Sequence, residues 1–517
     1  MEGERYNNKV NLTAKFRKEI LIFVALIACY FLLRLPNLTL QPIFADEAIY
    51  IRWAQVMRAE PTLRFLPLSD GKTPLFMWSI IPLFKVFDDP LFAGRFLSVT
   101  SGFATLVGVM LLGWKVFGKR TALWAGLLYT ITPYIVFFDR MALVDSMLSA
   151  FTVWALYFAI WLAQAVRLDL GMILGFILGG AWLTKTPAVV NLLLLPTSVF
   201  AFKRLKRDKY NLLRLFIFWG VAIFIALVMY NSLRLGPNFH LLSSRNADYI
   251  FSPLELVGRP LDPFIPHLRD IADWFPKLLT WPVLLLIVVG IIYAIFRALQ
   301  QSFLGPSLVV LLWAIIPILL SMAFLKTYTA RYLLPSIPLF LIFAGYGIER
   351  ISNIKYQISN RILTLILLII LLIMPLQFNY QLLTKPPPDT LPLAERKGYF
   401  EMWTAGYGLK EIAEYLVEQK KHGKVVVGTE GFFGTLPDGL YIYLDKADIA
   451  VIGSHATISA QIRQSTKDHL TFFVGNKRNL EGNISNVKLI KEYPKVNSLT
   501  DGPDSTVLYQ VLPEKSQ

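Results

Sequence analysis

Long apolar runs separated by short polar loops repeat along the first 388 residues of the chain. Most of these runs approach the roughly 17–25 residues that an α-helix needs to cross a bilayer. With 55% hydrophobic and 17% charged residues, the 517-residue chain is too apolar for a soluble protein of this length. The pattern predicts an all-α polytopic membrane module with about eleven transmembrane helices, at residues 20–38, 91–114, 121–138, 143–163, 171–184, 188–202, 212–232, 280–297, 306–325, 332–349 and 361–383.

The fifth and sixth predicted spans are short and meet at residues 184–187, which include Lys185 and Pro187. A pair of this kind need not cross the membrane fully if it is buried against other helices. We therefore predict a broken helix pair at this point.

Basic residues gather in alternate loops, as the positive-inside rule requires of cytoplasmic loops. This distribution explains the formal charge of +16 without nucleic acid as a partner. It places the N-terminus in the cytoplasm, and it places the segment 39–90 and everything after residue 383 on the other side. The single cysteine, Cys29, excludes a disulfide framework within the chain. The basic residues of the cytoplasmic loops are Lys115, Lys119, Arg120, Lys203, Arg204, Lys206, Arg207, Lys209, Arg297, Arg350, Lys355 and Arg361.

Two further regions differ in composition from the spans. The first outer loop, 39–90, is apolar, and the helical spacing of residues 48–57 predicts a helix in the plane of the interface; residues 270–281 have the same character. Residues 389–517 are more polar and predict a small extracytoplasmic α/β domain. Its expected elements are a helix at 407–420 and strands at 424–427, 440–444, 449–452, 470–474 and 507–511.

Adjacent carboxylates, Asp46 and Glu47, follow the first span directly. Ionisable groups at a membrane boundary are unfavourable and tend to mark functional sites. Asp46 suits a general base that accepts a proton from a hydroxyl, and Glu47 suits a residue that orients it or holds a cation. The alternative is that Asp46 only caps the helix that follows. The pair leaves room for a divalent metal ion without requiring one, and no other cofactor is indicated.

Cations occur at three other outer positions. Lys72 lies between Gly71 and Pro74 in a predicted stiff turn, where a lysine can bind a phosphate or a lipid head group. Arg140 can bind a phosphate or form a structural clamp with Asp145 or Asp46. The alternative for Arg331 and Tyr332 is that they only anchor the chain at the membrane interface. Charged residues of the same outer turns, to which we assign a supporting role, are Asp139 and Asp145.

One candidate base and several cations on the same side of the membrane fit group transfer from a lipid-linked phosphate, because cations stabilise the charge that develops on a leaving phosphate. The sequence contains no Walker-type glycine loop, zinc-ligand spacing or serine nucleophile elbow. The alternative is a transporter or flippase of lipid-linked sugars. Inverted repeats and charges near the membrane midplane would favour it, and the sequence shows neither.

The ordered motifs resemble the protein O-mannosyltransferase superfamily, whose relatives include the bacterial enzyme that transfers aminoarabinose to lipid A. The resemblance covers roughly residues 20–350. It implies the GT-C membrane fold and a polyprenyl-phosphate-linked sugar as donor. The motifs that support it are Asp46-Glu47, Gly71-Lys72-Thr73-Pro74-Leu75, Arg140-Met141-Ala142-Leu143-Val144-Asp145 and Arg331-Tyr332-Leu333-Leu334-Pro335.

The resemblance also implies roles for single residues. Asp46 would deprotonate the acceptor hydroxyl, Lys72 and Tyr332 (with Arg331) would contact the donor phosphate, and Asp145 would support the site by pairing with Arg140. The reaction would invert the anomeric carbon, and the lipid tail would lie near Lys185. The acceptor would be a protein or a glycolipid of the cell envelope, next to the lipid bilayer.

The chain departs from its relatives in two ways. The aminoarabinose-transferring relatives often have glutamate directly before the lysine, where this chain has Gly71. The eukaryotic protein mannosyltransferases carry a large β-trefoil domain for which this chain has no room. We expect the domain at 389–517 to present or select the acceptor. Trp403, Tyr407, Glu430 and Asp438 are candidates to line an acceptor site, with core packing and solvated loops as the alternative.

Overall fold

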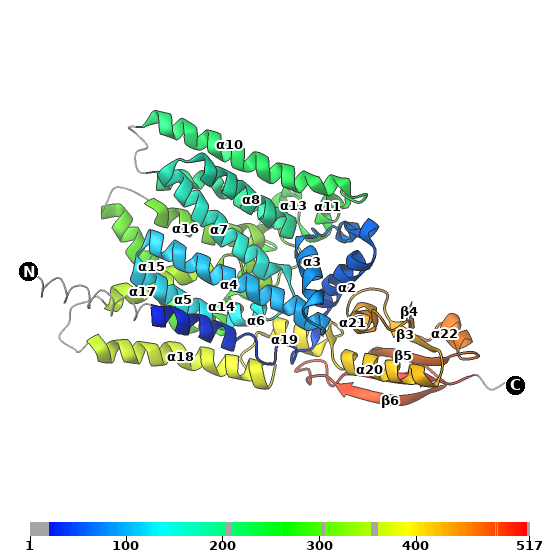
Figure 1. Cartoon of the computed structure of the whole chain (residues 1–517). Coiled ribbons are helices and arrows are strands. Elements are labelled where there is room, and N and C mark those ends of the chain that lie inside the picture. The colour runs from blue at the N-terminus through cyan, green and yellow to red at the C-terminus, as the bar shows by residue number, and fades with distance from the viewer. Residues whose placement is uncertain are drawn as a thin grey trace, which may run out of the picture.

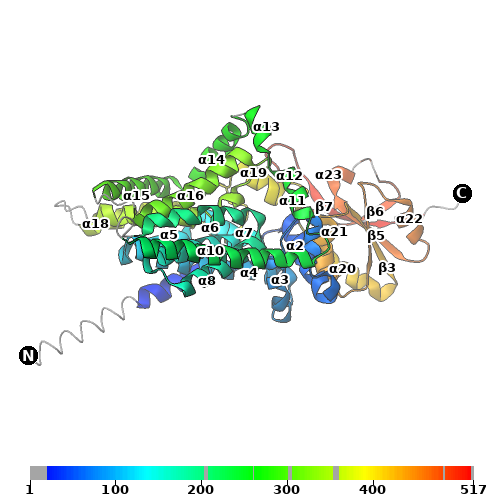
Figure 2. The ribbon, with the colours of Figure 1, turned by 90° about the horizontal axis from the view of Figure 1, so that it is seen from above.

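The computed structural model describes residues 20–202, 208–259, 261–300, 305–352, 360–480, 482 and 484–513. A bundle of long helices occupies one part of the molecule, and a small mixed domain lies at one end of it (Figure 1). The view from above shows the same arrangement, with the sheet at the opposite end of the molecule from α15 and α18 (Figure 2).

Helices occupy every one of the eleven predicted ranges, at least in part. Within the described ranges, five helices are long and apolar enough to cross a membrane, and six if a bent pair counts as one span. An integral membrane protein is therefore confirmed, whereas the number of eleven spans stays a prediction. The five helices are α4 (Pro90–Val116), α7 (Val144–Ala165), α10 (Lys209–Asn231), α15 (Trp281–Gln300) and α16 (Gly305–Phe324).

The other apolar segments are shorter or interrupted. The predicted break after the fifth span is confirmed, because α8 ends at Thr184 and a 3-10 turn begins at Thr186. α17 lies in the core, since every residue from Ile337 to Ile348 is buried. The remaining segments are the first helix (Ile20–Leu32), α8 (Leu168–Thr184), η4 (Thr186–Ala188), α9 (Val189–Leu194), η5 (Leu195–Ala201), α17 (Ile337–Ser352) and α18 (Asn360–Thr384).

The bent pair consists of α5 (Lys119–Ile131) and α6 (Pro133–Asp139), whose axes differ by 59°. Pro133 lacks an N–H and its ring excludes the preceding helical geometry, so the helix stops at Ile131 and restarts in a new direction. The break leaves carbonyl groups at the end of α5 without intrahelical donors. α6 then carries the chain to Asp139 and Arg140.

The first outer segment folds into short helices against one end of the bundle. α2 (Ala45–Ala59) is the predicted interfacial helix and starts three residues earlier than expected. Gly71 ends the turn η2 with a φ of 67°, a left-handed conformation that favours glycine, and so turns the chain toward Lys72. The other elements are η1 (Pro61–Leu63), η2 (Leu66–Asp70), α3 (Leu75–Ile80) and η3 (Ile81–Lys85).

The loop between α10 and α15 also forms short helices. The second predicted interfacial helix is α14 (Phe264–Leu278), which begins six residues earlier than expected. The smaller elements are η6 (Ser232–Leu235), α11 (Leu241–Ser244), α12 (Asn246–Tyr249) and α13 (Pro253–Val257).

The C-terminal part contains a five-stranded sheet in the order β4-β3-β5-β7-β6. The first three strands are parallel, with Val426 opposite both Ala450 and Thr471, and β7 runs antiparallel to both β5 and β6. The strands are β3 (Val425–Glu430), β4 (Ala450–Ser454), β5 (Leu470–Asn476), β6 (Val487–Pro494) and β7 (Ser505–Val511). The helical elements after the last span are α19 (Leu393–Arg396), η8 (Lys397–Glu401), α20 (Leu409–Gln419), η9 (Lys420–His422), α21 (Thr435–Leu444), α22 (Ala460–Ser465) and α23 (Lys477–Leu480).

A two-stranded pairing joins the two parts of the molecule. β1 (Ile43–Phe44), just before α2, pairs antiparallel with β2 (Ala405–Gly406), and the Ala45 N–H donates to the carbonyl of Thr404 at 3.0 Å. The N-terminal end of α2, which carries Asp46, is therefore fastened to the C-terminal part.

Candidate active site

Asp46 lies in the first turn of α2 and is 20% exposed. The helix begins at Ala45, so Asp46 does not cap it, and the helix-cap alternative is wrong. Its carboxylate accepts a contact from Arg331 Nη1 at 2.7 Å and lies 3.8 Å from Lys72 Nζ. Three motifs that are far apart in sequence thus meet at one carboxylate, as predicted.

Lys72 is held by acidic and aromatic groups. Its ammonium lies 3.3 Å from Asp70 and faces the rings of Tyr50 and Trp53, at 5.2 and 5.6 Å from their centroids. Aromatic faces attract a cation without neutralising its charge. The side chain therefore points toward Asp46 and these two rings.

Arg331 follows α16 in the turn η7 (Ala330–Leu333) and is largely buried, between the rings of Phe44 and Tyr332. Its Nε is buried and has no hydrogen-bond acceptor among the residues that the structure describes. A buried guanidinium donor normally has an acceptor. Arg331 therefore retains a donor for a further anionic group.

Lys185 completes the cluster, although the sequence motifs did not identify it as a phosphate ligand. Its ammonium pairs with Asp145 at 2.6 Å and lies 4.3 Å from the centroid of the Tyr332 ring. The predicted pairing of Asp145 with Arg140 is therefore wrong. The signal for Lys185 was its place at the break between α8 and η4.

The charges of the site reinforce one another. Burial raises the pKa of Asp46, but Arg331, Lys72 and Lys185 outweigh it, so the pKa lies below its usual value and the group is ionised at neutral pH. Burial lowers the pKa of Lys72, and its interactions with Tyr50, Asp46 and Asp70 raise it further than burial lowers it. The site thus holds charged partners of both signs.

Glu47 points away from this cluster. Its two oxygens accept hydrogen bonds from Arg95 Nε and Nη2, both at 2.8 Å, and from the backbone N–H groups of Ala142 at 2.7 Å and Phe44 at 2.9 Å. Both Glu47 and Arg95 are fully buried. The geometry gives Glu47 a structural role, so its assignment as a catalytic residue is corrected.

Arg140 is also excluded from the phosphate-binding group. Its guanidinium donates to the carbonyl groups of Arg34, Pro36 and Asn37 in the turn that follows the first helix, and the side chain is fully buried. These bonds hold that turn against the end of α6. Neither Asp145 nor Asp46 is its partner, so both predicted roles are wrong.

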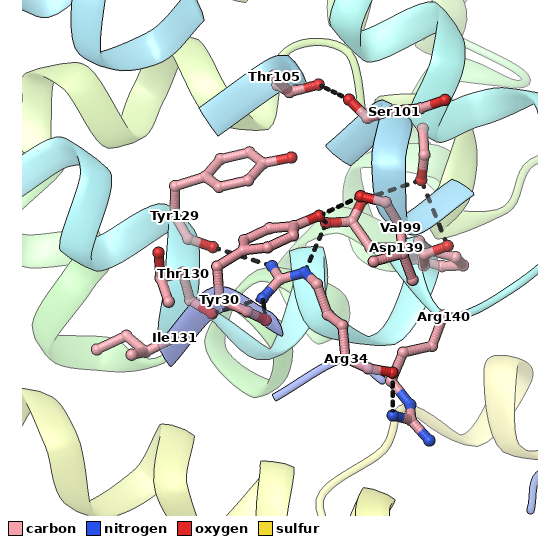
Figure 3. Close-up of polar contacts among 12 residues, drawn as sticks. Tyr30, Arg34, Val99, Ser101, Thr105, Tyr129, Thr130, Ile131, Asp139 and Arg140 are labelled. Atoms are coloured by element: carbon pink, nitrogen blue, oxygen red, sulfur yellow. Dashed lines mark hydrogen bonds and ion pairs between the residues drawn. The ribbon is translucent and has the colours of Figure 1, made fainter. Parts of the chain in front are cut away.

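Asp139 belongs to a buried cluster around the first helix (Figure 3). It accepts from Arg34 Nε at 2.9 Å, Tyr30 Oη at 3.2 Å and Ser146 Oγ at 3.0 Å. Arg34 in turn donates to the carbonyl of Thr130, which the break between α5 and α6 leaves free. The cluster therefore stabilises the bent span and does not face Asp46.

Glu395 of α19 is a neighbour of the site that the sequence did not reveal. Its Oε1 accepts from the backbone N–H of Ala330 at 3.0 Å, directly before Arg331. Burial raises the pKa of Glu395 to about 7, against the lowering effects of that hydrogen bond and of Arg331. In the sequence Glu395 stands directly before Arg396 and Lys397, so nothing distinguished it from an ordinary surface charge.

Two of the four candidates in the C-terminal part have structural roles. Glu430 accepts from the backbone N–H of Asn476 at 2.6 Å, and Asp438 accepts from Gly434 at 2.7 Å. Trp403 is half exposed.

The loop after β3 brings further aromatic side chains close to the site. Phe432 and Phe433 in this loop are exposed, and the ring of Phe433 lies 6.0 Å from that of Trp53, which faces Lys72. The C-terminal part therefore presents aromatic side chains beside the cation cluster.

No metal centre is evident. Within the described ranges there is no group of three or more His, Cys, Asp or Glu side chains placed to hold a metal ion. Asp46 and Glu47 have separate cationic partners, so they do not form a pair of ligands.

The site joins one carboxylate to three nearby cations at the end of a bundle of apolar helices, and comparisons with known proteins show what this chain resembles. Residues 71–232 match the family model described as dolichyl-phosphate-mannose-protein mannosyltransferase. No curated protein sequence matches the chain significantly.

Solved structures extend the likeness over nearly the whole chain. ArnT from Cupriavidus metallidurans in the apo state has a TM-score of 0.58 at 16% identity and covers 97% of this chain and 100% of its own. The same protein bound to undecaprenyl phosphate has a TM-score of 0.57 at 17% identity, and the likeness covers 95% of this chain and 97% of that one. A third structure is the archaeal oligosaccharyltransferase AglB from Archaeoglobus fulgidus in complex with an inhibitory peptide and a dolichol-phosphate. It has a TM-score of 0.54 at 12% identity, and the likeness covers 89% of this chain and 70% of that one. The predicted fold, a polytopic helical membrane module with a small C-terminal sheet domain, is thus confirmed, and the family match over residues 71–232 agrees with the predicted superfamily.

Proposed function

We propose that the protein transfers a sugar, mannose or a similar one, from a polyprenyl-phosphate donor to a hydroxyl group of a protein or cell-envelope glycolipid. One observation supports this most directly: the Asp46 carboxylate lies among Arg331, Lys72 and Lys185 at the end of the bundle that faces the C-terminal domain. The relatives bound to undecaprenyl phosphate and dolichol-phosphate support a donor of this class.

In the proposed reaction the donor phosphate binds the three cations. The acceptor oxygen forms a bond with the anomeric carbon as the bond from that carbon to the phosphate oxygen breaks, which inverts the configuration. The hydroxyl proton passes to Asp46, and polyprenyl phosphate leaves with the bonding electron pair. No strong acid is needed, because the cations stabilise the charge on the leaving phosphate.

The ion pairs of the resting site have a direct role in this scheme. Asp46 is a weak base while Arg331 and Lys72 hold its pKa low. A donor phosphate competes with Asp46 for the same two cations. Its binding therefore raises the basicity of Asp46 when an acceptor is to be deprotonated.

We place the site outside the cytoplasm. α4 begins beside the outer segment, and at 1.5 Å per residue this 27-residue helix spans roughly 40 Å and carries Lys115 in its last turn, where the basic loop begins. The site and the basic loop thus lie at opposite ends of the bundle.

We also propose that the C-terminal domain selects the acceptor. Phe433 contacts Trp53, and Trp53 faces Lys72, so the exposed aromatic loop reaches the edge of the site. Exchange of Phe433 for Ala should raise KM for the acceptor more than KM for the donor. An equal change in both would contradict this role.

The decisive experiment compares Asp46→Asn with Asp70→Asn. Both remove one acidic partner of Lys72, but only the first removes the base. Asp46→Asn should lower turnover by about 10²–10⁴-fold, with donor binding unchanged or tighter, whereas Asp70→Asn should retain turnover within a few fold. Near-normal turnover of Asp46→Asn would refute the base. A wild-type protein that moves a lipid-linked sugar across the membrane without releasing polyprenyl phosphate would show a flippase.

A further inference from the structure

The turn η7, which carries Arg331, has no hydrogen-bond cap from its own neighbourhood. It begins at Ala330, and the side chain of the residue before it, Thr329, makes no capping hydrogen bond. The first N–H groups of a helical turn have no acceptor within the turn. The acceptor comes instead from α19, where Glu395 Oε1 lies 3.0 Å from the Ala330 nitrogen although the two residues are 65 positions apart.

The carbonyl group of Ala330 is fixed as well, because it accepts a hydrogen bond from Tyr134 Oη of α6. Ala330 and Tyr134 are fully buried, and Glu395 is nearly so. A buried N–H or carbonyl group that loses its partner is unfavourable, because water does not reach it. The peptide units on both sides of the Ala330 Cα are thus held by other parts of the chain, and the second unit leads directly into Arg331.

The segment 395–406, at the junction of the bundle and the C-terminal domain (Figure 1), also reaches the strand before Asp46. Its β2 pairs with β1, and the ring centroid of Tyr399 lies 4.5 Å from that of Phe44. The Arg331 guanidinium lies 5.5 Å from the centroid of the same Phe44 ring and 2.7 Å from the Asp46 carboxylate. One short segment therefore holds both partners of the ion pair at the centre of the candidate site.

We propose that Glu395 is a positioning residue for the donor: it holds the turn η7 so that the Arg331 guanidinium lies between Asp46 and the donor phosphate. Without this acceptor, the buried Ala330 N–H must turn toward another partner, and Arg331 moves with the turn. The C-terminal part of the chain then completes the donor site, in addition to its proposed role toward the acceptor. The effect on the donor rests on the proposed function, whereas the effect on Arg331 does not.

The Asp46 carboxylate reports the position of Arg331 without any substrate. Burial raises the pKa of Asp46, and Arg331 is the strongest of the groups that lower it. Burial also raises the pKa of Glu395 to about 7, so this carboxyl is uncharged at the lower pH where Asp46 titrates. Exchange of Glu395 for an uncharged residue therefore leaves the charge near Asp46 unchanged, and a change in the pKa of Asp46 reports a displacement of its cation.

We would measure the pKa of Asp46 by isotope-edited infrared spectroscopy of the full-length protein without donor, with Asp46→Asn to assign the band. Glu395→Met, whose thioether is only a weak acceptor, should raise this pKa by about one unit. Glu395→Gln should leave it unchanged, because an amide oxygen accepts from the same N–H. Ala330→Pro removes the hydrogen bond from the donor side, at a position of a helical turn that suits proline, and should give the same rise as Glu395→Met.

The matched control is Glu401→Met, because Glu401 is a second buried glutamate of the same segment and pairs with Arg396 at 2.6 Å. This variant should lower the thermal midpoint without changing the pKa of Asp46. An unchanged pKa in both Glu395→Met and Ala330→Pro, or an equal rise in Glu401→Met, would overturn the proposal.

Binding of undecaprenyl phosphate in detergent then connects the position of Arg331 to the donor. Glu395→Met should weaken this binding about tenfold, and Arg331→Gln at least as much. The double variant should bind no more weakly than Arg331→Gln alone, because Glu395 acts through Arg331. Additive losses would overturn that mechanism. Wild-type binding by Arg331→Gln would instead refute the donor site of the proposed function, and the pKa of Asp46 would still decide whether Glu395 positions Arg331.

Discussion

The Glu47→Gln variant separates a structural carboxylate from a catalytic one. In the wild type, Oε1 accepts from Arg95 Nε and the Ala142 N–H, and Oε2 accepts from Arg95 Nη2 and the Phe44 N–H. Glutamine can keep only one of these oxygens. Its NH₂ group then faces two donors, so two hydrogen bonds are lost and the charge of Arg95 is no longer balanced.

The expected loss is large because both side chains are fully buried. Removing one partner of a buried ion pair destabilises proteins by about 3–5 kcal/mol. Arg95 retains the carbonyl groups of Leu38, Gln41 and Pro42 as partners, so we expect the lower end of this range, about 3 kcal/mol. Glu47→Gln should therefore denature at a clearly lower temperature.

The assay combines thermal denaturation in detergent with turnover per folded molecule below the midpoint. The double variant Glu47→Leu/Arg95→Leu is the control, because exchanging both charges for apolar groups should recover much of the stability. Turnover per folded molecule should stay near the wild-type value in Glu47→Gln. A variant with wild-type stability and a collapsed turnover would refute the structural role and restore Glu47 to the catalytic group.

The remaining predictions concern pH, packing and the phosphate site. Burial raises the pKa of Glu395 from its usual 4.5 to about 7 in the folded state, so the free energy of unfolding should fall by about 3 kcal/mol as pH rises through this window. The thermal midpoint of Glu395→Gln should not fall over the same pH range, and a fall as large as in the wild type would contradict this prediction. A methyl group on Gly102 would overlap Asp139 Oδ2, so Gly102→Ala should cost about 1–3 kcal/mol, whereas Gly220→Ala, with open space around it, should be neutral or stabilising in the same denaturation assay. Lys185→Gln should weaken binding of a polyprenyl phosphate at least about tenfold and Lys185→Arg much less, and equal affinity in both variants would exclude Lys185 from the phosphate site.

Much of the fold followed from hydrophobic patterning, and the exceptions have physical reasons. Residues 440–444 have the length and composition of a buried strand, yet they form the end of α21, because a short apolar run does not distinguish the two. β6 was missed because it is an edge strand with Lys488, Lys491 and Glu492 exposed, which protects the edge but hides the apolar signal. The helix at 407–420 and four of the five predicted strands are confirmed.

The candidate site was predictable only where motifs pointed to the same place. Asp46, Lys72 and Arg331 lie on short outer segments, and such segments converge at one end of a bundle. The sequence could not show that the side chains of Arg140 and Glu47 are buried among structural partners. Neighbouring residues on a helix or a turn point in different directions, so a charge next to Asp46 need not share its partners. The sequence also could not show that the break between α5 and α6 leaves the carbonyl of Thr130 free to accept a hydrogen bond from Arg34, which lies far away in sequence.

The small pairing between Ile43–Phe44 and Ala405–Gly406 sets a rule for engineering this molecule. A graft that exchanged residues 389–517 for those of another family member would remove half of this ribbon, and with it the anchor two residues ahead of Asp46. Arg52 and Gln55 of α2 would also lose Asp445 and the carbonyl of Ile442. In a working hybrid, residues 39–60 and residues 389–517 must therefore come from the same parent protein.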